Sequence, residues 1–200
     1  LTTNTAAAAA MLSSTLLATW LLGKPDLGMT INGCLAGLVA ITAPCAFVSV
    51  ESSAIIGLLA GLLVVLAVIM FDKVHVDDPV GALSVHLVNG VFGTLCVGLF
   101  AESQWMPNKA NGLFFGGGFT QLSVQLLGIV SAGAAVFVMA LIAWVILKAV
   151  MGIRVSVQEE IQGLDIGEHG NSCYPDFVTK KTLPVSIGSP VTSAVPAGRS

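Results

Sequence analysis

Five long stretches of this sequence contain no Asp, Glu, Lys or Arg, and they restrict the possible fold more than any other feature. They cover residues 1–23, 27–50, 52–71, 79–101 and 110–147. Crossing the hydrocarbon core of a bilayer takes about 20 apolar residues in a helix, whose backbone groups bond within the segment. Four stretches fit one crossing each. The fifth is longer, but its first part, NGLFFGGGFTQ, has too much glycine to be helical throughout. The sequence therefore predicts an all-α membrane protein with five transmembrane helices.

Composition and motifs restrict the function. Charged residues make up 10% of the chain, against about 25% in ordinary soluble proteins. A formal net charge of -3 and the lack of a basic stripe argue against a nucleic-acid partner. The four cysteines show no metal-binding spacing, and no GxSxG, HExxH or phosphate-loop motif occurs. We therefore expect no enzyme activity, no cofactor and no metal site.

The distribution of basic residues predicts the orientation in the membrane. With alternating spans, Lys24, Lys73, Lys148 and Arg154 fall on one side, and Lys109 falls on the other. An excess of Lys and Arg marks the cytoplasmic side, so we expect a cytoplasmic C-terminal tail and place Leu1 near the outer face. An odd number of helices, an external start and the absence of an initial methionine lead us to expect further helices upstream.

Three segments follow from this pattern: a transmembrane bundle over 1–151, a cytoplasmic regulatory tail over 152–177, and a disordered C-terminus over 178–200. In the tail, Ser156 and Glu159 have capping-box spacing, which predicts a short helix through Ile161. Gly163 is placed to end that helix.

Glycines recur four residues apart within two predicted spans. Gly33 pairs with Gly37, and Gly57 pairs with Gly61. This spacing lets helix backbones approach closely in lipid, so we interpret both pairs as packing positions.

The stretch DDPVGALSVHLVNGVFG places an ionisable ring, His86, inside a predicted span. On an α-helix over 77–100, Pro79 would lie in the first turn, behind the capping carboxylates of Asp77 and Asp78. His86 would then share one face with small or polar residues. These are Ala82, Asn89, Gly90 and Gly93.

Two interpretations of His86 remain open from the residues alone. It is either a neutral packing residue bonded to a neighbouring helix, or it lines a conduit for a small polar solute. Ionisable groups within membranes are costly and usually face a cavity, so function is the default hypothesis. His75, in a polar loop, is interpreted as a solvated side chain, and His169, before Gly170, as part of a local turn or cap.

Three stretches resemble a known family: VDDPVGALSVHLVNGVFGTLCVGLF, NGCLAGLVAITAPCAFVS and GLDIGEHGNSCY. Their order and spacing over 4–174 resemble the C-terminal half of an ammonium transporter of the Amt/Mep/Rh superfamily, Amt branch. The resemblance implies a plasma-membrane homotrimer with eleven helices per subunit, arranged as two five-helix inverted repeats around a pore. This chain would supply helices seven to eleven and the tail.

The resemblance also implies the site. His86 corresponds to the second of two pore histidines, and Ala82 to a pore-side position one turn earlier; with Asn89 and Gly90 they form the predicted pore and substrate set. Ammonium would be recruited at an outer vestibule, and ammonia and the proton would move past a narrow hydrophobic pore. The first-half histidine and the vestibule aromatics have no counterpart in this chain.

The tail of the family contacts a neighbouring subunit and communicates the state of the pore. The predicted regulatory residues are Gly163, Asp165, His169, Gly170 and Tyr174. A PII-type signalling protein is a further expected partner, although no residue here demonstrates it. Three positions depart from the family pattern: Pro44, which affects the shape of the second span; Gly81, where relatives often carry an acid; and Gly167, which has no hydroxyl to phosphorylate. The alternatives are an ammonium sensor signalling through its tail, or an unrelated channel for urea or water.

Overall fold

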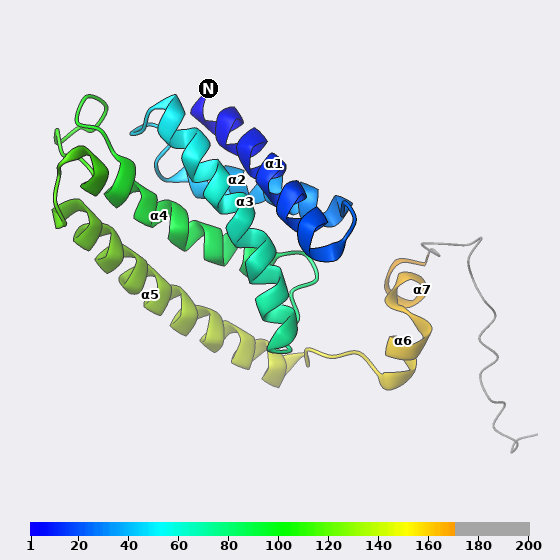
Figure 1. The fold of residues 1–200 in the computed structure, drawn as a ribbon. Helices are drawn as coiled ribbons and strands as arrows, with labels where there is room; N and C mark the ends of the chain where they lie inside the picture. Colours follow the sequence, from blue (N-terminus) through cyan, green and yellow to red (C-terminus); the bar gives the residue numbers. More distant parts are fainter. Residues whose placement is uncertain (171–200) are drawn as a thin grey trace, which may run out of the picture. The chain divides into compact units, whose positions relative to one another are not determined.

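The computed structural model describes residues 1–170, which contain helices and connecting loops and no strand (Figure 1). Seven α-helices follow one another in this described part, with a π-helical segment, η1 (Ala82–Val88), before the fourth and a short 3-10 turn, η2 (Leu113–Phe115), before the fifth. The α-helices are α1 (Thr2–Leu22), α2 (Leu27–Thr42), α3 (Val50–Lys73), α4 (Asn89–Phe100), α5 (Thr120–Val150), α6 (Val157–Gln162) and α7 (Leu164–His169).

The chain divides into two compact units. The first is Leu1–Trp144, and the second begins at Val145, within α5. The limits of the predicted segments, 1–151, 152–177 and 178–200, stay predictions. The last segment, with Cys173 and Tyr174 before it, lies outside the described residues.

Four helical segments are long and apolar enough to cross a membrane, which confirms the all-α membrane class. They are Thr2–Leu22, Val50–Lys73, Ala82–Phe100 and Thr120–Val150. The fifth predicted span, α2, forms but has only 16 residues, or about 24 Å at 1.5 Å per residue. Pro44 explains its end, because proline has no N–H for the carbonyl of Ala40 and its ring crowds that carbonyl. The chain continues in turns, in which Phe47 N–H donates to the Pro44 carbonyl at 2.8 Å.

The core of the first unit is built around α1, which packs against both α2 and α3. A Cβ atom on Gly37 or Gly57 would overlap the backbone of Ala6, and one on Gly61 would overlap the carbonyl oxygen of Ala10. The backbones therefore lie too close for any side chain larger than hydrogen at these positions. This confirms that the paired glycines are packing positions.

Hydroxyl groups add polar links between the same helices. Ser13 Oγ of α1 donates to the Leu58 carbonyl of α3 at 2.9 Å, and the Thr15 and Thr30 hydroxyls of α1 and α2 are 2.9 Å apart. Because lipid offers these groups no partner, such bonds add to the close packing.

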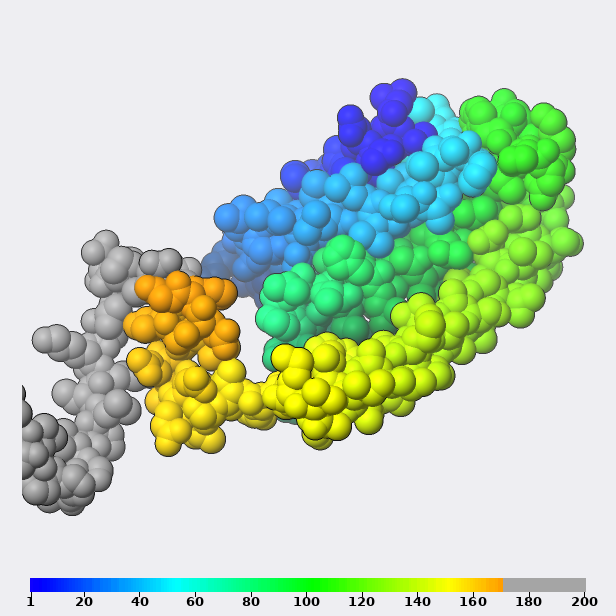
Figure 2. All heavy atoms as spheres, turned by 180° about the vertical axis from the view of Figure 1, so that it is seen from behind, coloured from blue at the N-terminus to red at the C-terminus, as the bar shows by residue number. Residues whose placement is uncertain are grey.

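The last span has a different environment. The glycine-rich stretch before it is irregular, as predicted: η2 is a single 3-10 turn, and α5 starts only at Thr120. No residue of α5 is buried by the described residues, 1–170. Figure 2 shows light-blue α2 packed closely against its neighbours, whereas openings remain between green α4 and yellow-green α5.

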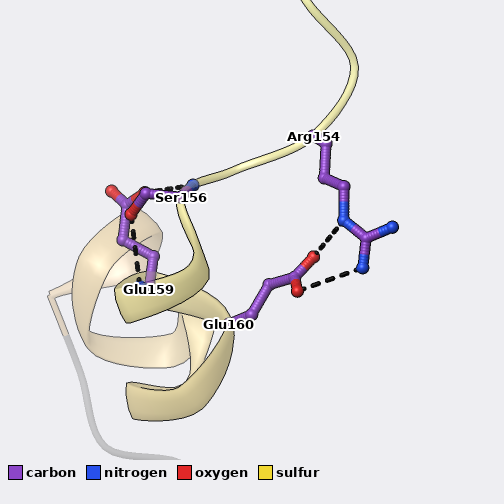
Figure 3. Close-up of polar contacts among 4 residues, drawn as sticks. All are labelled: Arg154, Ser156, Glu159 and Glu160. Atoms are coloured by element: carbon purple, nitrogen blue, oxygen red, sulfur yellow. Dashed lines mark hydrogen bonds and ion pairs between the residues drawn. The ribbon is translucent and has the colours of Figure 1, made fainter.

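In the second unit, the predicted capping box is present at Ser156 (Figure 3). Its hydroxyl accepts from the Glu159 N–H at 3.3 Å, and the Glu159 carboxylate accepts from the Ser156 N–H at 2.9 Å. The helix that follows, α6, ends at Gln162, one residue beyond the prediction, with Gly163 as its C-cap. Beside it, Arg154 Nε donates to Glu160 Oε1 at 2.7 Å.

A second short helix, α7, follows directly and was not predicted. His169 lies in its last turn, and Gly170 ends it with φ of 66°, a left-handed conformation that favours glycine. The interpretation of His169 as part of a local cap agrees with this geometry.

Candidate functional site

The candidate site begins at a left-handed glycine rather than at the proline. Residues 79 and 80 form a turn, Gly81 has φ of 74°, and η1 starts at Ala82. The prediction that Pro79 lies in the first helical turn is therefore wrong. The backbone changes direction at Gly81, so that the helix starts only after it. A side chain at Gly81 would be strained by that φ and would meet Val85 Cγ2 at 2.9 Å.

The carboxylate of Asp78 forms the start of η1. It accepts hydrogen bonds from the backbone N–H groups of Leu83 at 3.0 Å and Ser84 at 2.9 Å, and from the Ser84 hydroxyl at 2.7 Å. Partial burial raises the pKa of Asp78, but these bonds and one from the Ala82 backbone outweigh it and hold the pKa below its ordinary value. Asp78 is thus an anion at neutral pH. The prediction of two capping carboxylates is confirmed in part: Asp78 bonds to the first N–H groups of η1 from outside the helix, Gly81 occupies the N-cap position, and Asp77 does not take part.

The histidine lies in the π-helical turns of η1, whose backbone bonds run from i to i+5 and which are frequent at functional sites. At the junction with α4, the Asn89 N–H donates to the His86 carbonyl, while Asn89 Nδ2 donates to the Ser84 carbonyl at 2.9 Å. Sequence reasoning missed this segment. The signal was the presence of Asp78, Ser84 and Asn89, at spacings of six and five residues, in an otherwise apolar stretch.

His86 is exposed and lines an open groove of about 290 Å³ between two helices of the first unit. On the η1–α4 side its neighbours are Leu87, Gly90, Val91 and Thr94; on the α5 side the lining is Ile129, Ala132, Gly133 and Val136. The Thr94 hydroxyl donates to the Gly90 carbonyl at 2.9 Å, so its proton is committed. The groove is therefore apolar apart from the imidazole and one hydroxyl oxygen.

The residues that an α-helical wheel places on one face with His86 have different environments in the structure. Gly90 lies in the groove, and Ala82 is exposed one turn earlier, outside the groove lining. Asn89 is completely buried and does not line the groove, and Gly93 packs so closely on Ala40 that a Cβ would overlap the Ala40 backbone. The π-helical turns explain the division, because they hold more residues per turn than the 3.6 of the wheel.

Other ionisable groups lie apart from this groove. Within residues 1–170, His86 makes no hydrogen bond to another helix, and no cluster of three metal-binding side chains occurs. His75 is exposed in the loop after α3, with φ of 58° and its N–H donating to the Asp72 carbonyl at 3.1 Å. The interpretation of His86 as a packing residue requires a hydrogen bond to a neighbouring helix. The described part of the chain offers no such bond.

A second hollow, of about 330 Å³, lies in the loop between α4 and α5 and was not predicted. It is lined by Glu102, Ser103, Gln104, Asn111 and Phe115. Glu102 accepts from the Ser49 N–H at 3.1 Å and from Gln104 Nε2 at 2.9 Å, and Asn111 Oδ1 accepts from the Ser103 N–H at 2.6 Å. Glu102 thus holds the loop to the start of α3, and the bonds of Gln104 and Asn111 lie within the loop.

Known proteins match this fold and sequence over nearly the whole chain. The model of the Ammonium Transporter Family matches residues 1–174, and the chain belongs to this family. Ammonium transporter Amt2 of Archaeoglobus fulgidus is 43% identical over 193 residues, which is 92% of this chain and 41% of that protein. An ammonium transporter of Mycobacterium tuberculosis is 40% identical over 187 residues, covering 88% of this chain and 38% of that protein.

Solved structures agree with the sequence matches. The chain superposes on a Sensor Amt Protein with a TM-score of 0.74 at 35% identity, covering 84% of this chain and 40% of that one. Saccharomyces cerevisiae Mep2 gives a TM-score of 0.70 at 27% identity, with 78% and 36% covered. The chain spans roughly two fifths of the length of these relatives. The resemblance inferred from the three motifs is confirmed, and the chain is part of a multi-pass membrane protein.

Proposed function

We propose that the intact protein containing this chain moves ammonium or ammonia across the membrane through a narrow hydrophobic pore bordered by His86. The observation that carries the proposal is the position of His86, exposed in an apolar groove of a chain that belongs to the ammonium transporter family. The family assignment also argues against the alternative of an unrelated urea or water channel.

The chemistry of the groove suits a neutral hydrogen-bonding solute. Moving a cation from water into apolar surroundings costs several kcal/mol even after relaxation, so ammonium and potassium are both disfavoured there. A neutral imidazole offers one donor and one acceptor. His86 is thus able to form a hydrogen bond with ammonia after ammonium has lost its proton. A potassium ion has no proton to lose, so it cannot become a neutral solute of this kind.

The groove residues take different parts in this proposal. His86 and Gly90 line the groove, and Gly90 leaves space beside the ring, since a Cβ there would meet only Val39 Cγ1, at 3.9 Å. Ala82, exposed one turn earlier and outside the groove lining, is proposed to border the passage beyond it. Asn89 belongs to the same site but acts from the buried side of the helix.

The proposal extends to topology and partners. We place the protein in the plasma membrane with its C-terminus in the cytoplasm, supported by Lys24, Lys73, Lys148 and Arg154 on one side against Lys109 on the other. A homotrimer agrees with α5, an apolar helix of which no residue is buried within this chain. Gly163, Asp165, His169, Gly170 and Tyr174 are proposed to contact the neighbouring subunit, and a PII-type signalling protein to bind from the cytoplasm.

The test is uptake of methylammonium by the intact protein with His86→Ala. We expect a loss of at least about tenfold in rate, or loss of selectivity over potassium, because the groove then has no imidazole to bond the solute. His75→Ala is the matched control, since His75 is an exposed loop histidine, and it should transport like the parent. An unchanged rate together with unchanged selectivity in His86→Ala would remove His86 from the pore.

An ammonium sensor is the second candidate, favoured by the similarity to the Sensor Amt Protein. A sensor binds ammonium and passes a signal through its tail, whereas a transporter also accumulates substrate. Transport assays on vesicles that contain the intact protein separate the two: binding without uptake would identify a sensor.

A further inference from the structure

Ser84 is bonded from both sides by residues that are not its helical neighbours. Its N–H and its hydroxyl both donate to Asp78 Oδ2, at 2.9 and 2.7 Å. Its carbonyl accepts from Asn89 Nδ2 at 2.9 Å. Ser84 and Asn89 are both fully buried, so that water does not compete for the bond between them, whereas Asp78 is half-buried. We call this set of three residues the Ser84 clamp.

Asn89 adds a side-chain bond at the junction of the π-helix and the α-helix. Its N–H donates to the His86 carbonyl, and its side-chain amide donates to the carbonyl of Ser84. The side chain of Asn89 thus joins the end of η1 to the start of α4 in the core. Asp78 holds the beginning of η1 in the same way, through the N–H groups of Leu83 and Ser84.

His86 lies between the two ends of this set, two residues after Ser84 and three before Asn89. An α-helical register over the same residues would turn successive side chains by a different angle, so that the ring would leave the groove. The bonds that hold the π register thus also decide where the imidazole points. Val85, beside it, is fully buried against Ala36, Val64 and Val65, and this fixes the opposite side of the segment.

We infer that the Ser84 clamp positions His86 toward the groove, and that Asn89 is a positioning residue for transport rather than a group that contacts the solute. This inference rests on the proposed function. Asn89 Oδ1 supports it, because that atom is buried and has no hydrogen-bond partner within residues 1–170. An amide with one unpaired end is unfavourable in a core, so fold stability alone does not account for asparagine here.

The experiment compares three variants of the intact protein with the parent: Asn89→Leu, Ser84→Ala and Ser53→Ala. Leucine has a branched side chain like asparagine but cannot donate to the Ser84 carbonyl. Ser53 is the matched control, because it is a fully buried serine whose hydroxyl bonds to the Val50 carbonyl of its own helix, α3. Uptake of methylammonium gives Vmax and KM, ¹⁵N NMR reports the imidazole of His86, and thermal unfolding in detergent reports stability.

We expect Asn89→Leu to lower Vmax about tenfold, since a ring displaced by about 1 Å no longer meets the solute correctly. KM should stay within about twofold, because recruitment is not affected. The imidazole resonances of His86 should move. The unfolding temperature should change little, because the variant loses the bond to the Ser84 carbonyl but also removes the unpaired Oδ1. Ser84→Ala should lower Vmax less, about threefold, and Ser53→Ala should transport like the parent.

Parent Vmax and parent imidazole resonances in Asn89→Leu would overturn the inference. A lower Vmax with a lower unfolding temperature and unmoved resonances would also overturn it, because the role would then be purely structural. If Asn89→Leu does not fold, Ser84→Ala decides by the same two readings. His86→Ala in the same assay distinguishes failure of this inference from failure of the proposed function. If His86→Ala transports slowly and Asn89→Leu at the parent rate, only the role of the Ser84 clamp is rejected. If both variants transport at the parent rate, the pore role of His86 is rejected.

Discussion

Glycine has opposite effects in the three-helix packing of α1–α3 and in the groove between α4 and α5. Gly57 and Gly61 lie so close to α1 that a Cβ atom would overlap the backbone of Ala6 or Ala10. On the groove side of α5, a Cβ atom added to Gly133 would have no neighbouring atom within 4 Å. In the first region the missing side chain brings backbones together, and in the second it leaves space open.

The two regions differ in the helix that faces the glycine, and not in the glycine itself. Between helices in a membrane there is little hydrophobic driving force, so that close van der Waals packing must hold them. The alanine-rich segment of α1 offers a narrow partner to two helices at once, and those helices pack. The groove is lined on both sides by branched residues, such as Val91 of α4 and Ile129 and Val136 of α5. A gap remains beside His86.

The largest expected effect separates these two kinds of glycine. In Gly61→Ala the new methyl group overlaps the Ala10 carbonyl, so α1 and α3 must move apart, at a cost of about 1–3 kcal/mol. In Gly133→Ala the methyl group enters open space, and the better helix propensity of alanine is worth up to about 1 kcal/mol. Thermal unfolding of both variants in detergent measures the difference. Equal shifts of the same sign would show that the two regions do not differ in packing.

The next effect tests whether the groove-side helix depends on a polar cap. Asp78→Asn keeps the shape but weakens the bonds to Leu83 and Ser84, so we expect a loss of about 1 kcal/mol at pH 7. The folded pKa of Asp78 lies below its ordinary value of 3.8. The stabilisation by the carboxylate is therefore complete above that value and is lost as the pH falls through the folded pKa.

Unfolding of the parent and of Asp78→Asn as a function of pH checks this sign. The two curves should differ at pH 7 and converge in strong acid. Curves that remain parallel would mean that the Asp78 carboxylate does not support η1, and that packing alone holds the groove-side helix. Asp77→Asn is the control, because Asp77 precedes Asp78 in the same loop and does not bond to Leu83 or Ser84.

The sequence was sufficient wherever structure depends on nearby residues. Charge-free runs located the helices, the glycine pairs marked the close packing, and Ser156 with Glu159 marked the start of α6. It was insufficient where a side chain bonds to the backbone of a helix. Nothing in an apolar periodicity shows that the amide of Asn89 donates to a carbonyl of η1, and the wheel drawn for an α-helix then misplaces Asn89 and Gly93.

The remaining differences have separate causes. Pro44 was recognised as unusual, but how far its missing N–H would shorten α2 depends on the turns to Phe47 that follow. The groove combines residues 86–94 with residues 129–136, and one sequence does not show which faces of two distant helices approach. Of the groove residues, His86 and Gly90 were predicted from the sequence, because they lie on one face of the same helix.

The smallest effect on overall stability is expected in the tail, where neither kind of packing holds the structure. α6 has no buried residue, so its start depends on the capping box. Ser156→Ala should therefore increase amide hydrogen exchange over Val157–Gln162 without lowering the unfolding temperature of the spans.

The same cap should respond to pH. The hydrogen bond from the Ser156 hydroxyl, followed by that from the Ser156 N–H, holds the pKa of Glu159 below 4.5. Acid should therefore release the cap in the parent only below that pH, and should change little in Ser156→Ala. Arg154→Gln is the matched control, because exposed ion pairs such as Arg154–Glu160 contribute little. If Ser156→Ala destabilised the spans as much as Gly61→Ala does, the stability of the spans would depend on the tail cap, and the prediction would be wrong.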